Sequence, residues 1–200
     1  MQTEEVSSEL LRTDSIDNSF DCYGMCYIFN KRAERYGRWI NLLKVFGILT
    51  PALVGITAIS WGSDNKYLPY CISIAIFIMV IQFAFSILAI IYKWDDELSY
   101  AFEASQSYSE LQDRFRKLGK IPPDKYSELR EDFDLLNTEY RLRDQQDSKH
   151  NVKEWELRMG MRWALREFSR PCRGCNLTPT SMKSNDCPVC GKFSLKYKFS

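Results

Sequence analysis

Four cysteines near the end of this 200-residue chain are the residues whose types and spacing point most clearly to chemistry. Cys172, Cys175, Cys187 and Cys190 form two CxxC pairs separated by eleven residues. Two residues between cysteines let both thiolates reach one ion at a tight turn, and two such turns complete a tetrahedral all-thiolate site, which suits Zn²⁺ best. Because protein thiolates fill all four positions, we expect a structural zinc site rather than an open catalytic one.

Two disulfides or a redox CxxC pair compete with the zinc interpretation of these cysteines. A cytosolic location disfavours stable disulfides, and the pairing of two CxxC turns disfavours redox catalysis. Gly174 and Gly191 supply the backbone freedom that such turns need. Beyond them, Lys192–Ser200 alternates apolar with polar residues, which predicts a half-buried strand. We therefore expect residues 169–200 to form a zinc-ribbon module.

The rest of the chain offers no catalytic constellation. His150 is the only histidine, and neither a GxGxxG motif nor a Walker-type loop occurs. Cys22 and Cys26, four residues apart, are compatible with a metal or a redox pair. Without a nearby histidine, and in a reducing compartment, we favour small buried thiols. We expect no enzymatic activity.

Two long apolar stretches dominate the organisation of the chain. Residues 68–92 contain no charged side chain, and residues 40–61 contain only Lys44, which we expect to reach the headgroups. A membrane-spanning helix needs about 20 apolar residues. A chain of this size would not easily bury such segments on every face in a soluble core. We therefore predict a transmembrane helical hairpin over residues 40–92, with residues 62–67 as its connector.

The flanking charges predict the orientation of this hairpin. Four bases precede the first span and one follows the second, whereas the connector holds only one: Lys31, Arg32, Arg35, Arg38 and Lys93, against Lys66. Positive residues favour the cytoplasmic side, so we expect both termini in the cytoplasm of a multi-pass inner-membrane protein. No signal-peptide pattern precedes the first span.

Helices are expected on both sides of the spans, so the predicted fold is a mainly α membrane protein. Residues 1–19, acidic and serine-rich, read as a mobile leader, and residues 20–39 as a juxtamembrane helix. Residues 93–168 should form cytoplasmic helices. The first of these continues without a break from the second span to Leu118, and Pro122 and Pro123 end it. A second helix returns antiparallel to the first.

Polar residues within the spans and the basic tail bear on partners. Gln82 near the middle of the second span needs a partner, either in another chain or within the hairpin. Ser86 shares its helix face, and we predict that this face lines an inter-chain contact or a conduit. Residues 169–200 carry six bases and one acid, which suits an anionic leaflet, nucleotide or nucleic acid, or simply a solvated surface. With a whole-chain net charge of +1, a nucleic-acid partner is not indicated.

At this point the pattern resembles a known group. Two spans with a short connector and a following long helix resemble the SLATT bacterial two-span membrane effectors. The tail CRGC-x11-CPVC resembles the SLATT-like subgroup described as mobilome CxxCx(11)CxxC proteins. The resemblance implies an antiphage effector that disrupts or permeates membranes downstream of a nucleotide-signalling or sensor protein. Of the site residues, it carries over only the four cysteines.

Two functions from different classes follow. The first is a homo-oligomeric membrane effector of antiphage defence that permeabilises the inner membrane on an upstream signal. The alternative is a membrane-tethered zinc-ribbon adaptor that recruits a partner without forming a pore. Dye leakage or depolarisation upon expression separates the two.

Overall fold

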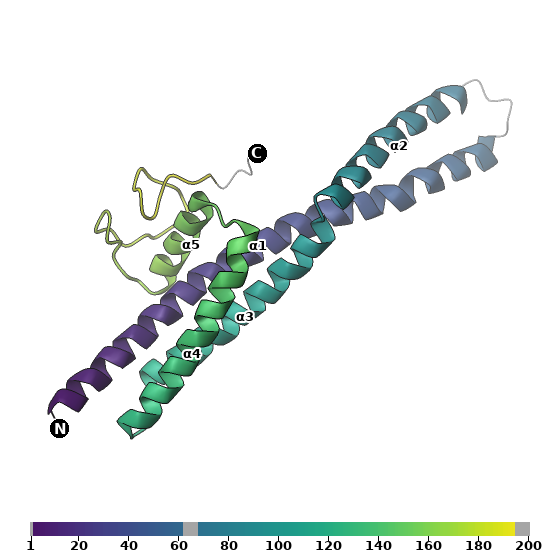
Figure 1. Ribbon diagram of the computed structural model, residues 1–200. Coiled ribbons are helices and arrows are strands. Elements are labelled where there is room, and N and C mark those ends of the chain that lie inside the picture. Colours follow the sequence, from purple (N-terminus) through teal and green to yellow (C-terminus); the bar gives the residue numbers. More distant parts are fainter. Residues whose placement is uncertain (1, 62–67, 195–200) are drawn as a thin grey trace. The chain divides into compact units, whose positions relative to one another are not determined.

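The computed structural model describes residues 2–61 and 68–194, and these residues are mainly helical (Figure 1). The elements are α1 (Gln2–Trp61), α2 (Leu68–Ile91), α3 (Trp94–Lys120), α4 (Tyr126–Asp147), the 3-10 turn η1 (Ser148–His150) and α5 (Glu154–Glu167). The chain forms two compact units. We call Arg32–Tyr100 the hairpin unit, and Met1–Lys31 with Ala101–Ser200 the helical domain.

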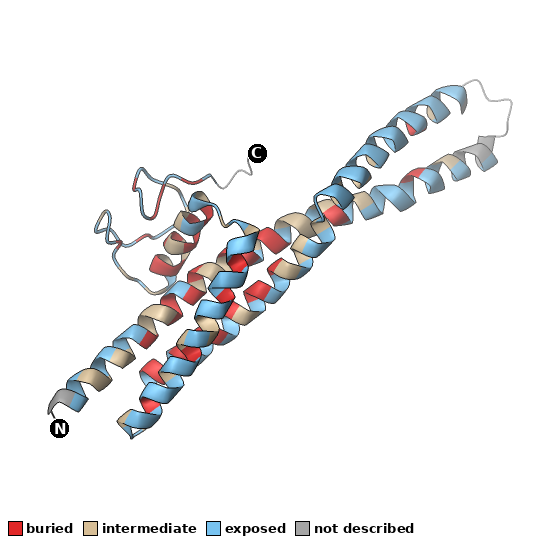
Figure 2. Cartoon of the chain, viewed as in Figure 1, coloured by how far each residue is buried: buried red, intermediate tan, exposed pale blue. Residues whose placement is uncertain are grey.

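The hairpin unit holds α2 and the C-terminal half of α1, and the apolar segment of α1 already begins in the helical domain. Two helical segments, Glu4–Ile56 and Pro69–Ile91, are long and apolar enough to cross a membrane. Only 11% and 6% of their most apolar windows is buried, so the chain itself does not cover this surface. Figure 2 shows α2 almost entirely in the colour of exposed residues. The connector predicted at residues 62–67 lies outside the described residues.

The junction between α2 and α3 departs from the uninterrupted helix that the sequence predicts. A turn at Tyr92 and Lys93 separates the two helices. Lys93 has a positive φ of 50°, a left-handed conformation that ends a right-handed helix. Its carbonyl accepts a hydrogen bond from the N–H of Glu97 at 3.0 Å, so the next helix starts immediately. The prediction of a continuous helix was therefore wrong at this junction, where a two-residue turn separates α2 from α3.

The acidic leader is also different from its prediction. Residues 2–19 belong to α1 instead of forming a mobile segment. Tertiary contacts explain the difference, because Ser15 and Ser19 are fully buried in the helical domain. Asp17 accepts a hydrogen bond from Arg170 at 2.6 Å, and Arg12 donates to the carbonyl of Gly119 at 3.4 Å. Composition alone does not reveal partners that lie more than 100 residues away.

The helices α3 and α4 pair as the antiparallel hairpin that the prolines predict. Phe115 of α3 packs edge-on against Phe133 of α4, with ring centroids 6.3 Å apart. At the other end of the pair, the fully buried Tyr108 donates its hydroxyl hydrogen to Asp147 at 2.5 Å. Arg143 holds the second oxygen of Asp147 at 3.3 Å. A buried network of paired polar groups therefore fixes the register of α3 against α4.

The helix α5 crosses α1 at two glycines. A Cβ on Gly160 would lie 2.7 Å from the carbonyl oxygen of Gly24, so the two backbones touch. Beside this crossing, Trp163 stacks on Tyr27 with ring centroids 4.4 Å apart. After the C-cap Phe168, the N–H of Arg170 bonds to the carbonyl of Leu165 at 2.9 Å. This bond turns the chain from α5 directly toward the first cysteine pair.

The C-terminal segment contains no β-strand among its described residues, 169–194. The ribbon predicted there is replaced by irregular loops and two tight turns. Of the strand predicted at Lys192–Ser200, residues 192–194 are not extended into a ladder, and Lys192 itself has a positive φ of 53°. Residues 195–200 lie outside the described residues. The predicted strand is therefore wrong over residues 192–194 and stays a prediction over the rest.

Candidate metal centre

The first CxxC turn directs two sulfur atoms to one point. The N–H of Asn176 bonds to the carbonyl of Cys172 at 2.7 Å and closes the turn. The N–H of Gly174 points at Sγ of Cys172 at 3.4 Å. Backbone donors of this kind stabilise a thiolate, which is the form that binds a metal.

The second CxxC turn repeats this geometry. The N–H of Gly191 bonds to the carbonyl of Cys187 at 2.9 Å, and the N–H of Val189 lies 3.4 Å from Sγ of Cys187. Backbone hydrogen bonds from Cys190 and Val189 lower the pKa of Cys187 to about 7. Burial raises the pKa of Cys190 above its ordinary value. Each turn thus carries donors placed for a charged sulfur.

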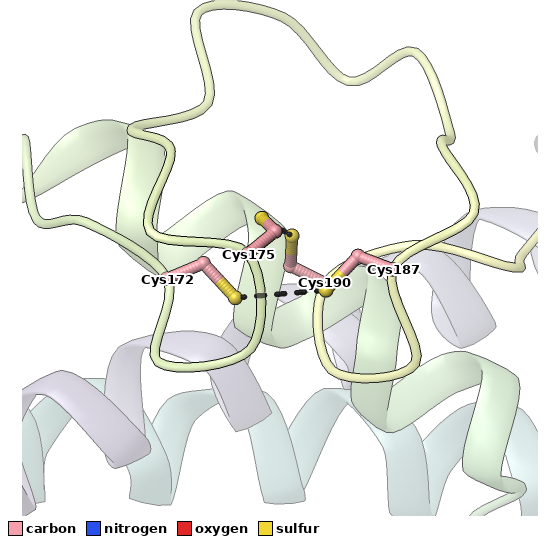
Figure 3. Close-up of side chains that lie close together, drawn as sticks. All are labelled: Cys172, Cys175, Cys187 and Cys190. Atoms are coloured by element: carbon pink, nitrogen blue, oxygen red, sulfur yellow. Dashed lines mark hydrogen bonds between the residues drawn. The ribbon is translucent and has the colours of Figure 1, made fainter.

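The four sulfurs face one another between the two turns (Figure 3). Sγ of Cys172 lies 3.9 Å from Sγ of Cys187, and Sγ of Cys175 lies 3.8 Å from Sγ of Cys190. All four lie within 4.8 Å of one another. With Zn–S bonds of about 2.3 Å, a regular tetrahedron has edges of about 3.8 Å. A disulfide needs about 2.05 Å, and all four cysteines are free thiols. The geometry fits one tetrahedral metal ion.

The glycines of the two turns are required by space rather than by backbone freedom. A Cβ on Gly191 would lie 2.2 Å from the carbonyl oxygen of Asn185, and one on Gly174 would lie 2.7 Å from a side chain of the other turn. The left-handed conformations belong to their neighbours Asn176 and Lys192, with φ of 56° and 53°. The glycines were correctly singled out, but the predicted reason was wrong.

The metal centre lies in a hydrophobic core that other helices share. Cys172, Cys187 and Cys190 are buried together with Phe20 of α1 and with Ala164 and Leu165 of α5. Around this core pack the partly buried Tyr23, Met161, Phe168 and Cys175. The four cysteines therefore do not form a separate module. They complete the contact between α1 and α5 within the helical domain.

One residue at this centre, Arg162 of α5, was missed by sequence reasoning. Its side chain is buried and donates three hydrogen bonds into the cysteine segment. The acceptors are the carbonyl of Ser181 at 2.8 Å, the carbonyl of Cys190 at 3.2 Å and Sγ of Cys190 at 3.8 Å. A base at helical spacing normally lies on a solvated face, so its sequence context carries no signal.

None of the other predicted residues belongs to the core around the four cysteines. Cys22 is fully buried, as predicted, whereas Cys26 is half-buried, with its sulfur 3.6 Å from the hydroxyl of Ser105. In the hairpin unit, Ser86 is half-buried. A Cβ on Gly47 would lie 3.0 Å from Nε2 of Gln82, so the amide lies against the facing helix.

A cavity of about 530 Å³ lies among α1, α4 and α5 of the helical domain. Apolar side chains line it together with the carboxylates of Asp21, Asp144 and Asp147. Burial, and secondarily the charge of Asp17, raises the pKa of Asp21.

Comparison with known proteins identifies the family. The chain matches the family described as Mobilome CxxCx(11)CxxC protein over residues 12–193. This match covers the second candidate membrane segment, the first one from residue 12 onward, and all four cysteines. No curated protein and no solved structure matches the chain. The chain therefore belongs to the mobilome CxxCx(11)CxxC protein family.

Proposed function

We propose that this protein is a two-span membrane effector of bacterial antiphage defence whose helical domain is held together by one zinc ion. The observation that carries the proposal is the continuity of α1. One helix contributes Phe20 to the core around the cysteines and, further along, forms the first apolar segment. A change in the helical domain therefore has an unbroken helical path to the membrane.

Membrane insertion is supported by length, composition and exposure. The second apolar segment, Pro69–Ile91, is long enough for a bilayer core of about 30 Å. The exposed side chains of α2 are mostly isoleucine, phenylalanine and leucine, which suit lipid. The excess of bases before the first span favours cytoplasmic termini in the inner membrane. A reducing cytoplasm would keep the four thiols available for zinc.

The effector mechanism requires more than one chain. Two helices do not enclose a water-filled path, so permeabilisation implies a homo-oligomer. The antiphage role and the upstream nucleotide-signalling or sensor partner rest on the resemblance to SLATT proteins. In this proposal, the partner acts on the helical domain, and α1 transmits the change to the spans.

A second candidate function is a membrane-tethered adaptor that recruits a partner without forming a pore. One observation favours it: the amide of Gln82 lies against Gly47 of its own hairpin. The polar group best placed to face other chains thus lies against a helix of its own chain. Ser73 likewise donates its hydroxyl hydrogen to the carbonyl of Pro69 in the same helix, at 2.9 Å. The hairpin would then act as an anchor.

Expression in bacterial cells separates the two functions. We would measure uptake of a membrane-impermeant dye and membrane potential for the wild type, for Gln82→Leu and for the control Ser73→Ala. The effector function predicts leakage by the wild type and by the control, and less leakage and weaker oligomerisation for Gln82→Leu. A quiet membrane with a co-purifying partner supports the adaptor. If Gln82→Leu leaks and oligomerises like the wild type, the face of Gln82 and Ser86 is not the functional one.

A further inference from the structure

Arg162 is a base that contacts the cysteine cluster through hydrogen bonds to Cys190. Its side chain is 7% exposed, and its guanidinium is fixed by three acceptors in the segment that it faces. Two of them belong to Cys190, whose carbonyl and sulfur both accept from Nη1, at 3.2 Å and 3.8 Å. The third, the carbonyl of Ser181, accepts from Nε at 2.8 Å. The guanidinium thus binds the loop between the two cysteine pairs as well as a metal ligand.

The charge of a loaded site explains why a cation is needed there. Four thiolates around one divalent ion carry two net negative charges, and three of the four cysteines are buried. A buried charge is expensive unless it is paired and hydrogen-bonded. The neighbouring bases Arg173 and Lys192 are exposed, and Arg170 binds Asp17. Arg162 is the buried base with a hydrogen bond to a ligand sulfur.

We propose that Arg162 is a positioning residue of the metal centre. From α5 it holds Cys190 in place, and its positive charge offsets the negative charge of the metal–thiolate group. The inference rests on the proposed metal and does not depend on the effector function. Arginine suits this role better than lysine, because its planar fork reaches a carbonyl on each side and a sulfur at once. Groups that bind metal ligands from outside commonly change metal affinity by about 10- to 100-fold when they are removed.

The test uses the full chain in detergent micelles, loaded with zinc. We would compare Arg162→Met and Arg162→Lys with Arg158→Met, which lies one turn earlier on α5 and pairs with Glu154 at 3.2 Å. Transfer of zinc to a colorimetric chelator should be about tenfold faster for Arg162→Met. It should be intermediate for Arg162→Lys, which keeps the charge but loses the fork. The Arg158→Met control should release zinc at the wild-type rate.

Cobalt-loaded protein gives a readout that a merely structural role would not change. Removal of a donor to Sγ of Cys190 should shift the thiolate-to-cobalt charge-transfer band of Arg162→Met, while Arg158→Met keeps the wild-type band. Wild-type zinc release and a wild-type band in folded Arg162→Met would overturn the proposal, even if its melting temperature fell. If Arg162→Met does not fold, Arg162→Lys decides. Faster release with a shifted band supports the role, and wild-type behaviour refutes it. A wild type that binds neither metal refutes the metal site itself.

Discussion

Alkaline pH should destabilise the helical domain through three groups that hold their protons only while it is folded. The hydroxyl of Tyr108 is fully buried and donates to Asp147 at 2.5 Å. Burial first, and then the hydrogen bond to Asp147, raises the pKa of Tyr108 above its ordinary value of 10.0. Burial is also the largest cause that raises the pKa of Tyr140, and that of Cys22 from 9.0. In the unfolded chain all three would ionise near their ordinary values.

The sign of the effect follows from proton counting. Each folded-state pKa is raised, so above pH 9 to 10 the unfolded chain binds fewer protons than the folded domain, and stability falls as pH rises. At pH 11 the loss is about 1.4 kcal/mol for each tyrosine and about 2.7 kcal/mol for Cys22, or about 5.5 kcal/mol in all. Small domains are stable by about 5–15 kcal/mol, so the domain approaches unfolding at this pH.

The assay is urea unfolding of the full chain in micelles at pH 8, 10 and 11, followed by helical circular dichroism. Tyr108→Phe should lose about 1.5–3 kcal/mol at pH 8, because the carboxylate loses a buried donor. Its further loss between pH 8 and 11 should be smaller than that of the wild type by about 1.4 kcal/mol. Tyr126→Phe, at the less buried start of α4, is the control.

Comparison between variants removes the contribution of the metal centre, which is common to both proteins. An equal loss in the wild type and Tyr108→Phe between pH 8 and 11 would refute the reasoning. So would a phenol absorbance near 295 nm showing that all eleven tyrosines ionise together near pH 10 while the helices persist.

Two further predictions follow from close contacts. Gly160→Ala should lower the unfolding free energy by about 1–2 kcal/mol, because its Cβ meets the carbonyl of Gly24 at 2.7 Å and overpacking outweighs the helix propensity gained. Gly55→Ala, with nothing within 4 Å, should not destabilise the protein in the same urea series. Cys172→Ser should lower the zinc content below one ion per chain and reduce the melting temperature of the helical domain. Elemental analysis that finds no zinc in wild-type protein purified without chelator would contradict this.

The sequence predicts best those features that depend on local pattern. The apolar run of α2 ends at Ile91, one residue before the predicted end of the span. Pro122 and Pro123 correctly place the turn between α3 and α4. Each signal determines the local structure of the residues that carry it, so no distant contact is needed to interpret it.

Tertiary contacts explain where the sequence misled. Residues 2–19 are polar enough to appear mobile, yet Asp17 finds Arg170 across 153 positions and Ser15 is fully buried. The strand predicted from Lys192 onward does not begin at residues 192–194, where Lys192 is left-handed, and its remaining residues lie outside the described part of the chain. Patterns of composition and alternation describe what a segment can do, and its partners determine what it does.

The metal centre depends both on local sequence pattern and on tertiary contacts. The CxxC spacing predicts the cluster of four sulfurs, because each turn is local and chelation requires the two turns to meet. Nothing in the spacing predicts Arg162 or Phe20, which come from α5 and α1. Arg162 is one base among many on charged helices, and Phe20 precedes the cysteines by about 150 positions. Only the packing of the helices brings these side chains to the sulfurs.

This packing changes what the loss of metal would do. Were the cysteines an independent module, metal removal would unfold only residues 169–194 and leave the helices intact. Instead Cys172 shares a core with Phe20 and Leu165, so the loop segment covers the contact between α1 and α5. A structural zinc site contributes about 10–16 kcal/mol, as much as the whole stability of a small domain. Metal release should therefore loosen α5 from α1, the same helix that continues into the first apolar segment. In the effector proposal, an intact zinc site is then a condition for any signal to reach the membrane.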